Sequence, residues 1–459
     1  MLDQKIAQDV IFQGLSLGAD FCDIFIEKNF VDSIAINSSK VKDIKSGVDF
    51  GIGIRLIFGT QSLYGYTNSA RKEDLLELTK TLGAQYNKKI DNIPSLSFKT
   101  FNPTLINAVS NLEKPTEYKV SKLLELNDLT RKQSNLIEQV NINLLQRRQE
   151  VEVFDSEGLH MNDIRPYCRI SSSAIAKDGT EQASGSWNPG VRGGYQFVED
   201  LDFNWIADYT AKKAVTVLKA KPCPAGKMPV VIDNGFGGVI FHEACGHSLE
   251  TTAVEKKASV FWDKKGEMIA HEALSAVDDG TIDNLWGSLS CDDEGMQTQK
   301  TQLIKNGKLE NFLCDRLGHI KTGHPRTGSA RRESYKYAPA SRMRNTFIEA
   351  GPHSLEELLS SMGDGLYAKS MGGGSVNPGT GEFNFSVEEG YMVKNGKIQE
   401  AVKGATLIGR GEEIMKDISM VGNNLDFAAG ICGSVSGGVP VTVGQPAVKV
   451  DQILVGGNA

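Results

Sequence analysis

The chain has 459 residues, of which 40% are hydrophobic and 23% charged, and its formal net charge at pH 7 is −7. This composition is that of an ordinary globular protein, and the length favours two domains. The acidic balance, with basic residues only in scattered pairs such as Arg147-Arg148, argues against nucleic acid as the main partner.

The sequence also argues against a membrane protein or a secreted one. No apolar run approaches the ~20 residues of a membrane span, and the first residues, MLDQKIAQDV, lack the basic start and apolar core of a signal peptide. The seven cysteines are an odd number scattered through a long chain, which is typical of reduced thiols. We therefore expect a cytoplasmic protein that does not bind membranes.

The first half of the chain contains both helical and strand-like patterns. Apolar residues at helical spacing predict a helix over residues 4–17, which Gly18 would end, and residues 21–67 are strand-like. Further helices are predicted at 70–85, 116–137 and 204–220, and further strands at 140–154 and 168–176.

The second half has more glycines and shorter strands. We predict a domain boundary near KPCPAGKM, residues 221–228, because two prolines and a glycine follow a finished helix, which gives domains 1–222 and 223–459. Two KNGK stretches, Lys305–Lys308 and Lys394–Lys397, predict hairpin turns. Because helices and strands are segregated, we predict an α+β fold with largely antiparallel sheets and a β-rich C-terminal domain.

The strongest chemical signal is the stretch FHEACGH, in which His242 and His247 flank Glu243. Zinc proteases hold their metal with two histidines on one helix, but in the pattern H-E-x-x-H. Residues five apart on an ideal helix are rotated by roughly 140°, against roughly 40° for residues four apart. Both histidines can face one metal only if the helix contains a π-type turn, or ends at Gly246 and swings His247 back.

Glu243 has the position of a general base. A carboxylate beside a metal-activated water can take its proton as the water attacks a carbonyl, and can pass it to the leaving amine. A catalytic zinc needs a third protein ligand, which the spacing does not identify. The candidates are His271, His319, His324, several acids and the cysteines, among which Cys245 has an awkward place for a ligand and Cys432 lies in a glycine-rich loop.

Several longer stretches resemble the TldD/PmbA family of metalloproteases, on its TldD side. They are GADFCDIFIE, FHEACGHSLE, TGSARRESYKYAPASRMRNTFIEAG, MGGGSVNPGTGEFNFSVEEGYMVKNGKI and ICGSVSGGVPVTVGQP, and they run through most of the chain. The resemblance implies an H-E-x-x-x-H zinc site with His242, His247 and Cys432 as ligands and Glu243 as catalytic general base. It also implies that residues 223–459 form the metalloprotease domain and that residues 1–222 help to form a dimer and its cleft.

The same resemblance implies a peptidase that degrades short or unfolded peptides in an enclosed cleft, as a homodimer or with a TldE/PmbA-type subunit. Residues 372–376 and the strand after them could pair with an extended peptide, although the substrate-binding residues stay unknown. Arg331 and Arg332 either bind a carboxylate or form a solvated surface pair.

Two other functions use the same residues. The chain could be a non-catalytic peptide-binding or regulatory scaffold with a structural zinc, or a hydrolase of small non-peptide amides. Structural zinc usually has paired C-x-x-C ligands, which this sequence lacks, so the peptidase interpretation is favoured.

Overall fold

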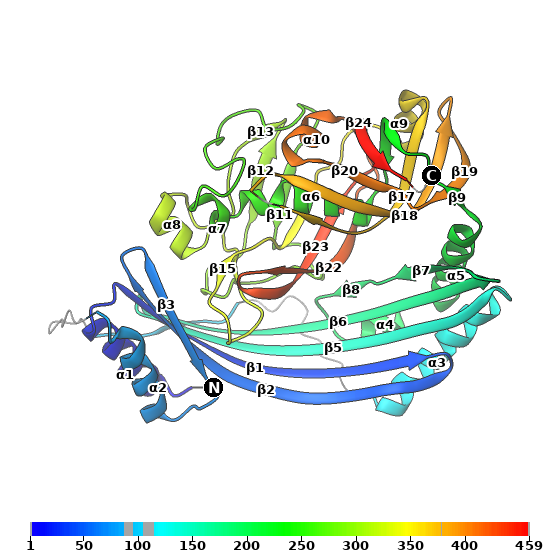
Figure 1. Ribbon diagram of the computed structural model, residues 1–459. Helices are drawn as coiled ribbons and strands as arrows, with labels where there is room; N and C mark the ends of the chain where they lie inside the picture. The colour runs from blue at the N-terminus through cyan, green and yellow to red at the C-terminus, as the bar shows by residue number, and fades with distance from the viewer. Residues whose placement is uncertain (1, 87–94, 104–113, 378, 458–459) are drawn as a thin grey trace.

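The computed structural model describes residues 2–86, 95–103, 114–377 and 379–457. Four long antiparallel strands, β2, β1, β5 and β6, form a curved layer in the lower half of Figure 1, and the C-terminal half of the chain lies over one face of it. The predicted α+β class with largely antiparallel sheets and a β-rich C-terminal part is confirmed.

The long strands belong to a sheet with the order β3-β2-β1-β5-β6-β4, in which β7 and β8 also pair with β6. Its strands are β1 (Phe21–Asn37), β2 (Lys40–Phe58), β3 (Gln61–Thr67), β4 (Lys99–Phe101), β5 (Ile137–Asp155), β6 (Leu159–Asp178), β7 (Glu181–Trp187) and β8 (Gly190–Val191). Ser38 and Ser39 both have positive φ and close the β1–β2 hairpin in two residues, as tight hairpins require.

The predicted helices of the first half are present and pack at the two ends of this sheet (Figure 1). α1 (Gln4–Ser16) and α2 (Lys72–Gly83) contact each other and the β1–β3 end, whereas α3 (Thr116–Lys132) and α5 (Phe203–Lys219) contact each other and β5–β7. The short helix α4 (Gln196–Glu199) lies just before α5 in the chain. Helix α1 starts where the Asp3 carboxylate accepts two backbone hydrogen bonds, which satisfies donors of the first turn.

The C-terminal half contains a small barrel, closed because β17 pairs with both β10 and β18. The strands of this sheet are β9 (Lys221–Pro222), β10 (Gly226–Ile232), β17 (Gly365–Val376), β18 (Glu382–Lys394), β19 (Lys397–Lys403), β20 (Thr406–Arg410), β21 (Ile418–Val421) and β24 (Val448–Gly456). The KNGK hairpins are confirmed: β18 and β19 meet at Lys394 and Lys397, with Asn395 and Gly396 at positive φ.

A second C-terminal sheet has the order β13-β12-β11-β16-β23-β22, so that β22 is an edge strand. Its strands are β11 (Ala276–Asp279), β12 (Lys300–Lys305), β13 (Lys308–Leu309), β16 (Asn345–Ile348), β22 (Asp426–Ser434) and β23 (Gly437–Gln445), and a separate pair is β14 (Ala330–Arg331) with β15 (Ala340–Ser341). The other KNGK turn joins β12 to β13.

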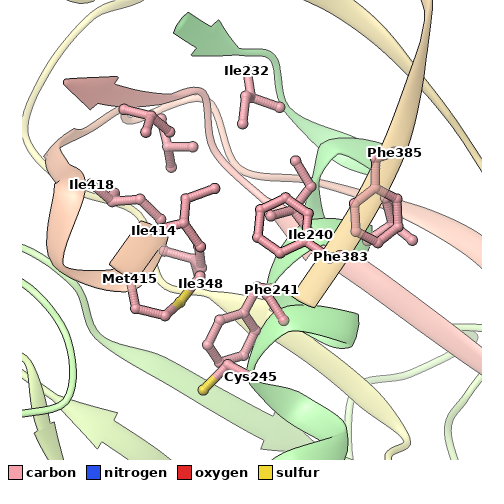
Figure 2. Packing of buried hydrophobic residues seen from close by; sticks show 14 of the residues in the cluster. Ile232, Ile240, Phe241, Cys245, Ile348, Phe383, Phe385, Ile414, Met415 and Ile418 are labelled. Atoms are coloured by element: carbon pink, nitrogen blue, oxygen red, sulfur yellow. The ribbon is translucent and has the colours of Figure 1, made fainter. Parts of the chain in front are cut away.

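The helical segments of the C-terminal half are short. They are η1 (Gly235–Gly238), α6 (Val239–Ala244), η2 (Gly246–Leu249), α7 (Thr251–Val254), α8 (Arg316–Thr322), α9 (Leu355–Met362) and α10 (Gly411–Asp417). Figure 2 shows Ile240 and Phe241 of α6 packed among Phe383 and Phe385 of β18 and Met415 of α10. This apolar cluster fixes α6 against the barrel.

Buried ion pairs join the two halves of the chain. Arg55 of β2 donates to both carboxylate oxygens of Asp23 at 2.9 and 2.7 Å and to Glu294 of the C-terminal half at 2.8 Å. Arg165 of β6 likewise bonds Asp293 at 2.5 Å. Buried arginines whose acids come from both halves hold the C-terminal part in one position on the long sheet.

The predicted domain boundary near residue 222 stays a prediction, although β9 already pairs with the C-terminal strand β19. Within the described residues, no helix is long and apolar enough to cross a membrane. All seven cysteines lie in the described part of the chain, and all are free thiols and buried.

Candidate metal centre

The stretch that carries both histidines is a helix that breaks after six residues. Helix α6 ends at Ala244, the backbone of the next residue, Cys245 (φ −129°, ψ −49°), lies outside the helical region, and η2 begins at Gly246. The break turns His247 toward His242, so that the ring centroids are 5.0 Å apart. Of the two predicted irregularities, the structure has an early helix end, two residues before the predicted end at Gly246, and no π-type turn in this segment.

Gly246 is required for packing and not for an unusual backbone conformation. It does not have a positive φ, but a Cβ on this residue would lie 2.3 Å from the Sδ of Met343. Gly411 of α10 packs closely against the end of α6: a Cβ added to Gly411 would lie 2.0 Å from the Ala244 carbonyl oxygen. Neighbours from distant parts of the chain therefore fix where α6 ends.

Cys432 of β22 completes a group of three candidate metal ligands. Its Sγ lies 3.3 Å from Nε2 of His242 and 3.3 Å from Nε2 of His247. The three ligand atoms all lie within 4.8 Å of one another, and no other such group is found among the described residues. The structure thus brings together the three side chains that the resemblance implied.

The side chains of this group change the pKa values of one another. Burial raises the pKa of the Cys432 thiol, but the adjacent imidazoles of His242 and His247 overcome this effect and lower the pKa to about 4. Burial also lowers the pKa of His247, whereas the charge of Glu250 and the bond to Cys432 raise it well above the usual value. The lowered pKa favours the thiolate of Cys432, which is the form that binds metals, whereas the raised pKa of His247 means that a metal must displace a proton from that imidazole.

Glu250 supports His247 from behind, and the sequence motif did not reveal it. Its Oε2 lies 3.0 Å from Nδ1 of His247, and its Oε1 accepts a hydrogen bond from the Met343 backbone at 3.2 Å. A carboxylate in this place keeps the proton on Nδ1 and leaves the Nε2 lone pair directed at a metal. The only sequence signal was a glutamate three residues after His247. This spacing indicates a contact with His247 only when the position of the helix break is known.

His242 has no comparable support. Its Nδ1 is buried and lacks a hydrogen-bond partner within the part of the chain that the structure describes. Its orientation follows from its place on α6 and from the contact of Nε2 with Cys432. The two histidines are therefore held by different means.

Glu243 borders the group but is not one of its three members. Its Oε2 lies 3.8 Å from Nε2 of His247, the same nitrogen that faces Cys432, and its side chain is partly exposed. The carboxylate is thus next to the space where a metal would lie and is open to solvent. Its catalytic role stays a prediction.

The other candidate ligands lie elsewhere. Cys245 is buried in the apolar cluster around α6, where burial raises its pKa, in keeping with a packing role. Nδ1 of His271 accepts a bond from the Ala273 amide, and His319 pairs through Nδ1 with the carbonyl of His324. None of the three histidines belongs to the metal-binding group.

Arg331 and Arg332 are not the solvated surface pair considered above. Both are buried: Arg331 donates to the Met343 carbonyl at 2.6 Å, and Arg332 donates to the Asp293 carbonyl and the Tyr64 hydroxyl, both at 3.2 Å. The surface interpretation is wrong because backbone carbonyls and a hydroxyl, rather than water, solvate these guanidinium groups. Arg331 thus connects its segment to Met343, and Arg332 connects it to Asp293 and to Tyr64 of the long sheet.

Comparison with known proteins gives the same assignment over most of the chain. Models of the PmbA/TldA metallopeptidase family match residues 22–85 (domain 1), 110–218 (central domain) and 225–457 (C-terminal domain). A "Metalloprotease TldD homolog" from Haemophilus influenzae is 38% identical over 449 residues, or 96% of this chain and 93% of that protein. A "Zinc metalloprotease TldD homolog" from Saccharolobus solfataricus is 28% identical over 96% of this chain and 97% of that protein.

A solved structure shows that the fold is shared. The crystal structure of TldE from Thermococcus kodakarensis has a TM-score of 0.78 at 18% identity, and the match covers 98% of this chain and 99% of that one. The matching family models, the TldD homologues and the His-His-Cys group agree with one another. The chain belongs to the TldD/PmbA family of metallopeptidases, on its TldD side.

Proposed function

We propose that the protein is a zinc-dependent peptidase that cleaves short or unfolded peptides in an enclosed cleft. One observation carries this proposal: two imidazoles and a thiolate converge within 4.8 Å, beside the carboxylate of Glu243. The proposal includes zinc as the cofactor, His242, His247 and Cys432 as its ligands, and Glu243 as the general base.

The donor set suits zinc. Zinc binds thiolate at about 2.3 Å and imidazole at about 2.0–2.1 Å, and tetrahedral geometry then places sulfur and nitrogen about 3.6 Å apart. Both Sγ–Nε2 distances are 3.3 Å, so small movements of the side chains would complete such a site. One relative is itself called a zinc metalloprotease.

Three protein ligands favour a catalytic site over a structural one. Structural zinc sites are closed by four protein ligands, whereas catalytic sites keep one position open. The group found in the described chain has three members, and Glu243, whose Oε2 lies 3.8 Å from Nε2 of His247, is partly exposed. These observations support the peptidase over the alternative of a peptide-binding scaffold with structural zinc.

Each residue has a distinct part in the proposed reaction. Zinc, when bound, activates water and polarises the scissile carbonyl. Glu243 takes the proton from the attacking water and delivers it to the leaving amine. Glu250 holds the His247 ring with Nε2 directed at the metal, and Cys432 supplies a negative ligand.

The substrate and partner assignments are part of the same proposal. Residues 374–376 of β17 pair with β18, whereas the pairing of β17 with β10 covers only residues 366–368, so an extended peptide could add to the other side. The fold likeness to TldE supports a partner of the same family, and a homodimer remains the alternative. The free cysteines support a cytoplasmic location.

The decisive experiment measures zinc content and peptidase activity of this chain purified alone, beside the Glu243→Gln variant. We expect about one zinc per chain in both proteins and cleavage of unfolded peptides by the wild type only. Cleavage by Glu243→Gln at the wild-type rate would refute the general base. Zinc without cleavage of any unfolded peptide, alone or with a TldE-type subunit, would favour the scaffold, and cleavage of acyl amides alone would favour the third function.

A further inference from the structure

A buried arginine, Arg342, lies directly behind the strand that carries Cys432. Its Nη2 donates to the carbonyl oxygen of Cys432, and its Nη1 donates to Oγ of Ser436 at 2.9 Å and to the carbonyl oxygen of Gly437 at 2.8 Å. These three acceptors span the β22–β23 turn from the metal ligand to the far side. One planar guanidinium therefore fixes the hairpin at both ends.

Arg342 is itself held in place. Its backbone N–H donates to the Ser329 carbonyl at 3.0 Å, and it is among the largest fully buried side chains of the protein. Two of its acceptors are carbonyl groups and the third is a hydroxyl, so polar groups of the hairpin offset part of its cost of burial, while its Nε has no hydrogen-bond partner among the described residues.

The next residue reaches the other side of the metal centre. The Met343 backbone N–H donates to Oε1 of Glu250, whose other oxygen lies 3.0 Å from Nδ1 of His247. The Met343 side chain also packs against Gly246 at the helix break. Arg342 thus bonds the backbone of Cys432, and Met343 bonds Glu250, which holds His247. These two neighbouring residues connect two ligands that are 185 residues apart in sequence.

We propose that Arg342 is a positioning residue for the metal centre: it sets the place of Cys432 relative to His247, because residues 342 and 343 hold the two ligand-bearing elements together. This inference rests on the proposed metal site and adds a residue that touches neither metal nor substrate. It gives the edge strand β22 a fixed position that its own small apolar cluster with Val439 and Val441 would not supply.

The test uses the full chain, with zinc and cobalt(II) as the probes. Arg342→Lys retains the charge but cannot reach three acceptors with a planar fork. We expect zinc affinity to fall about 10- to 100-fold, as for other residues that orient metal ligands. The thiolate-to-cobalt charge-transfer absorption should also weaken, because Cys432 is displaced.

Arg344→Lys is the matched control. Arg344 is equally buried, but its side chain bonds Asp278 at 2.6 Å, Thr298 at 2.7 Å and the Gly328 carbonyl at 2.8 Å, away from the hairpin. We expect this variant to lose stability to urea while keeping the wild-type zinc affinity and cobalt spectrum. Equal loss of metal affinity in both variants would reduce Arg342 to a general structural role and overturn the proposal.

Ser436→Ala provides a second, milder variant in case Arg342→Lys does not fold. It removes one acceptor of Arg342 and should weaken zinc binding by up to about tenfold. Unchanged zinc affinity and cobalt spectrum in this variant, or in a folded Arg342→Lys, would refute the positioning role. If the wild type itself bound neither metal, the proposed function would fail first, so the two failures are distinguishable.

Discussion

The two sides of the metal centre are built in different ways. His242 lies on α6, whose apolar residues belong to the main core of the C-terminal half, whereas Cys432 lies on an edge strand in a cluster with only Val439 and Val441. At the hairpin turn beside Cys432, Val435 is 67% exposed. Packing fixes α6 and with it His242, and buried hydrogen bonds fix the hairpin that carries Cys432. The comparison teaches that one metal centre can combine both kinds of support.

Removal of the hairpin ligand should have the largest effect. In Cys432→Ser, a neutral hydroxyl replaces a thiolate whose pKa is lowered to about 4 by His242 and His247. We expect zinc affinity to fall by more than the about 100-fold seen on loss of an orienting residue. Competition with a chromophoric chelator measures this change.

Cys245→Ala is the control for that experiment, since Cys245 is a buried thiol of the same region outside the metal-binding group. It should lose stability and keep its zinc affinity. Unchanged zinc stoichiometry in Cys432→Ser would remove the hairpin from the site altogether.

Glu250→Gln tests the support of the helix side. An amide has one acceptor oxygen, whereas Glu250 faces both Nδ1 of His247 and the Met343 N–H. Its NH2 group would either oppose the Met343 N–H or donate to Nδ1 and move the ring proton to Nε2, where the metal binds. We expect zinc affinity to fall about 10- to 100-fold by the same titration. Glu255→Gln, which removes only an ion pair with Lys321, should bind zinc normally.

The difference between the two sides also decides what could be predicted from sequence. The helices of the first half and the Asn395-Gly396 turn follow local patterns, and their presence was predicted correctly. His242 and His247 lie within one short motif, which predicted that they come together, and their role as metal ligands stays a prediction. The helix ends two residues before the predicted position, because Met343 and Gly411, which lie far along the chain, fix where it ends.

The hairpin side was not accessible to local reasoning. Cys432 was identified through the family resemblance alone, since no spacing rule joins it to His247. The burial of Arg331 could not be predicted either, because its acceptor is a backbone carbonyl. Every residue has such a carbonyl, so the sequence does not show which one an arginine will bond. Long-range contacts of this kind leave no periodic signal in a single sequence.

Gly246→Ala tests the packing at the helix break. The added methyl would lie 2.3 Å from the Met343 Sδ, and its accommodation should lower the free energy of unfolding by about 1–3 kcal/mol, measured by urea denaturation. Met343→Ala should also destabilise the protein, but it makes room for the methyl, so the double variant should lose less than the sum. Additive losses would show that the close contact is not what requires glycine.

The smallest effect is expected at a buried carboxyl behind the helix side. Asp315 caps α8 through Gly318 and accepts a bond from Thr251, the first residue of α7, at 3.3 Å. Burial, and then the charge of Glu294, raises the pKa of Asp315 from 3.8 to about 6. Because the folded state holds this proton more tightly than the unfolded state, stability from this group falls as pH rises from about 4 to about 6.

Asp315→Asn removes the buried charge and keeps Oδ1 as an acceptor for the Gly318 N–H. At pH 7.5 the variant should be about 1–2 kcal/mol more stable than the wild type, and this gain should shrink toward zero at pH 4, where the wild-type carboxyl is protonated. Urea denaturation of both metal-free proteins at the two pH values measures the difference. An equal gain at both would mean that packing, and not ionisation, sets the stability here. A pH-dependent gain would show that the helix side, although built by packing, also contains a charge that the fold only partly compensates.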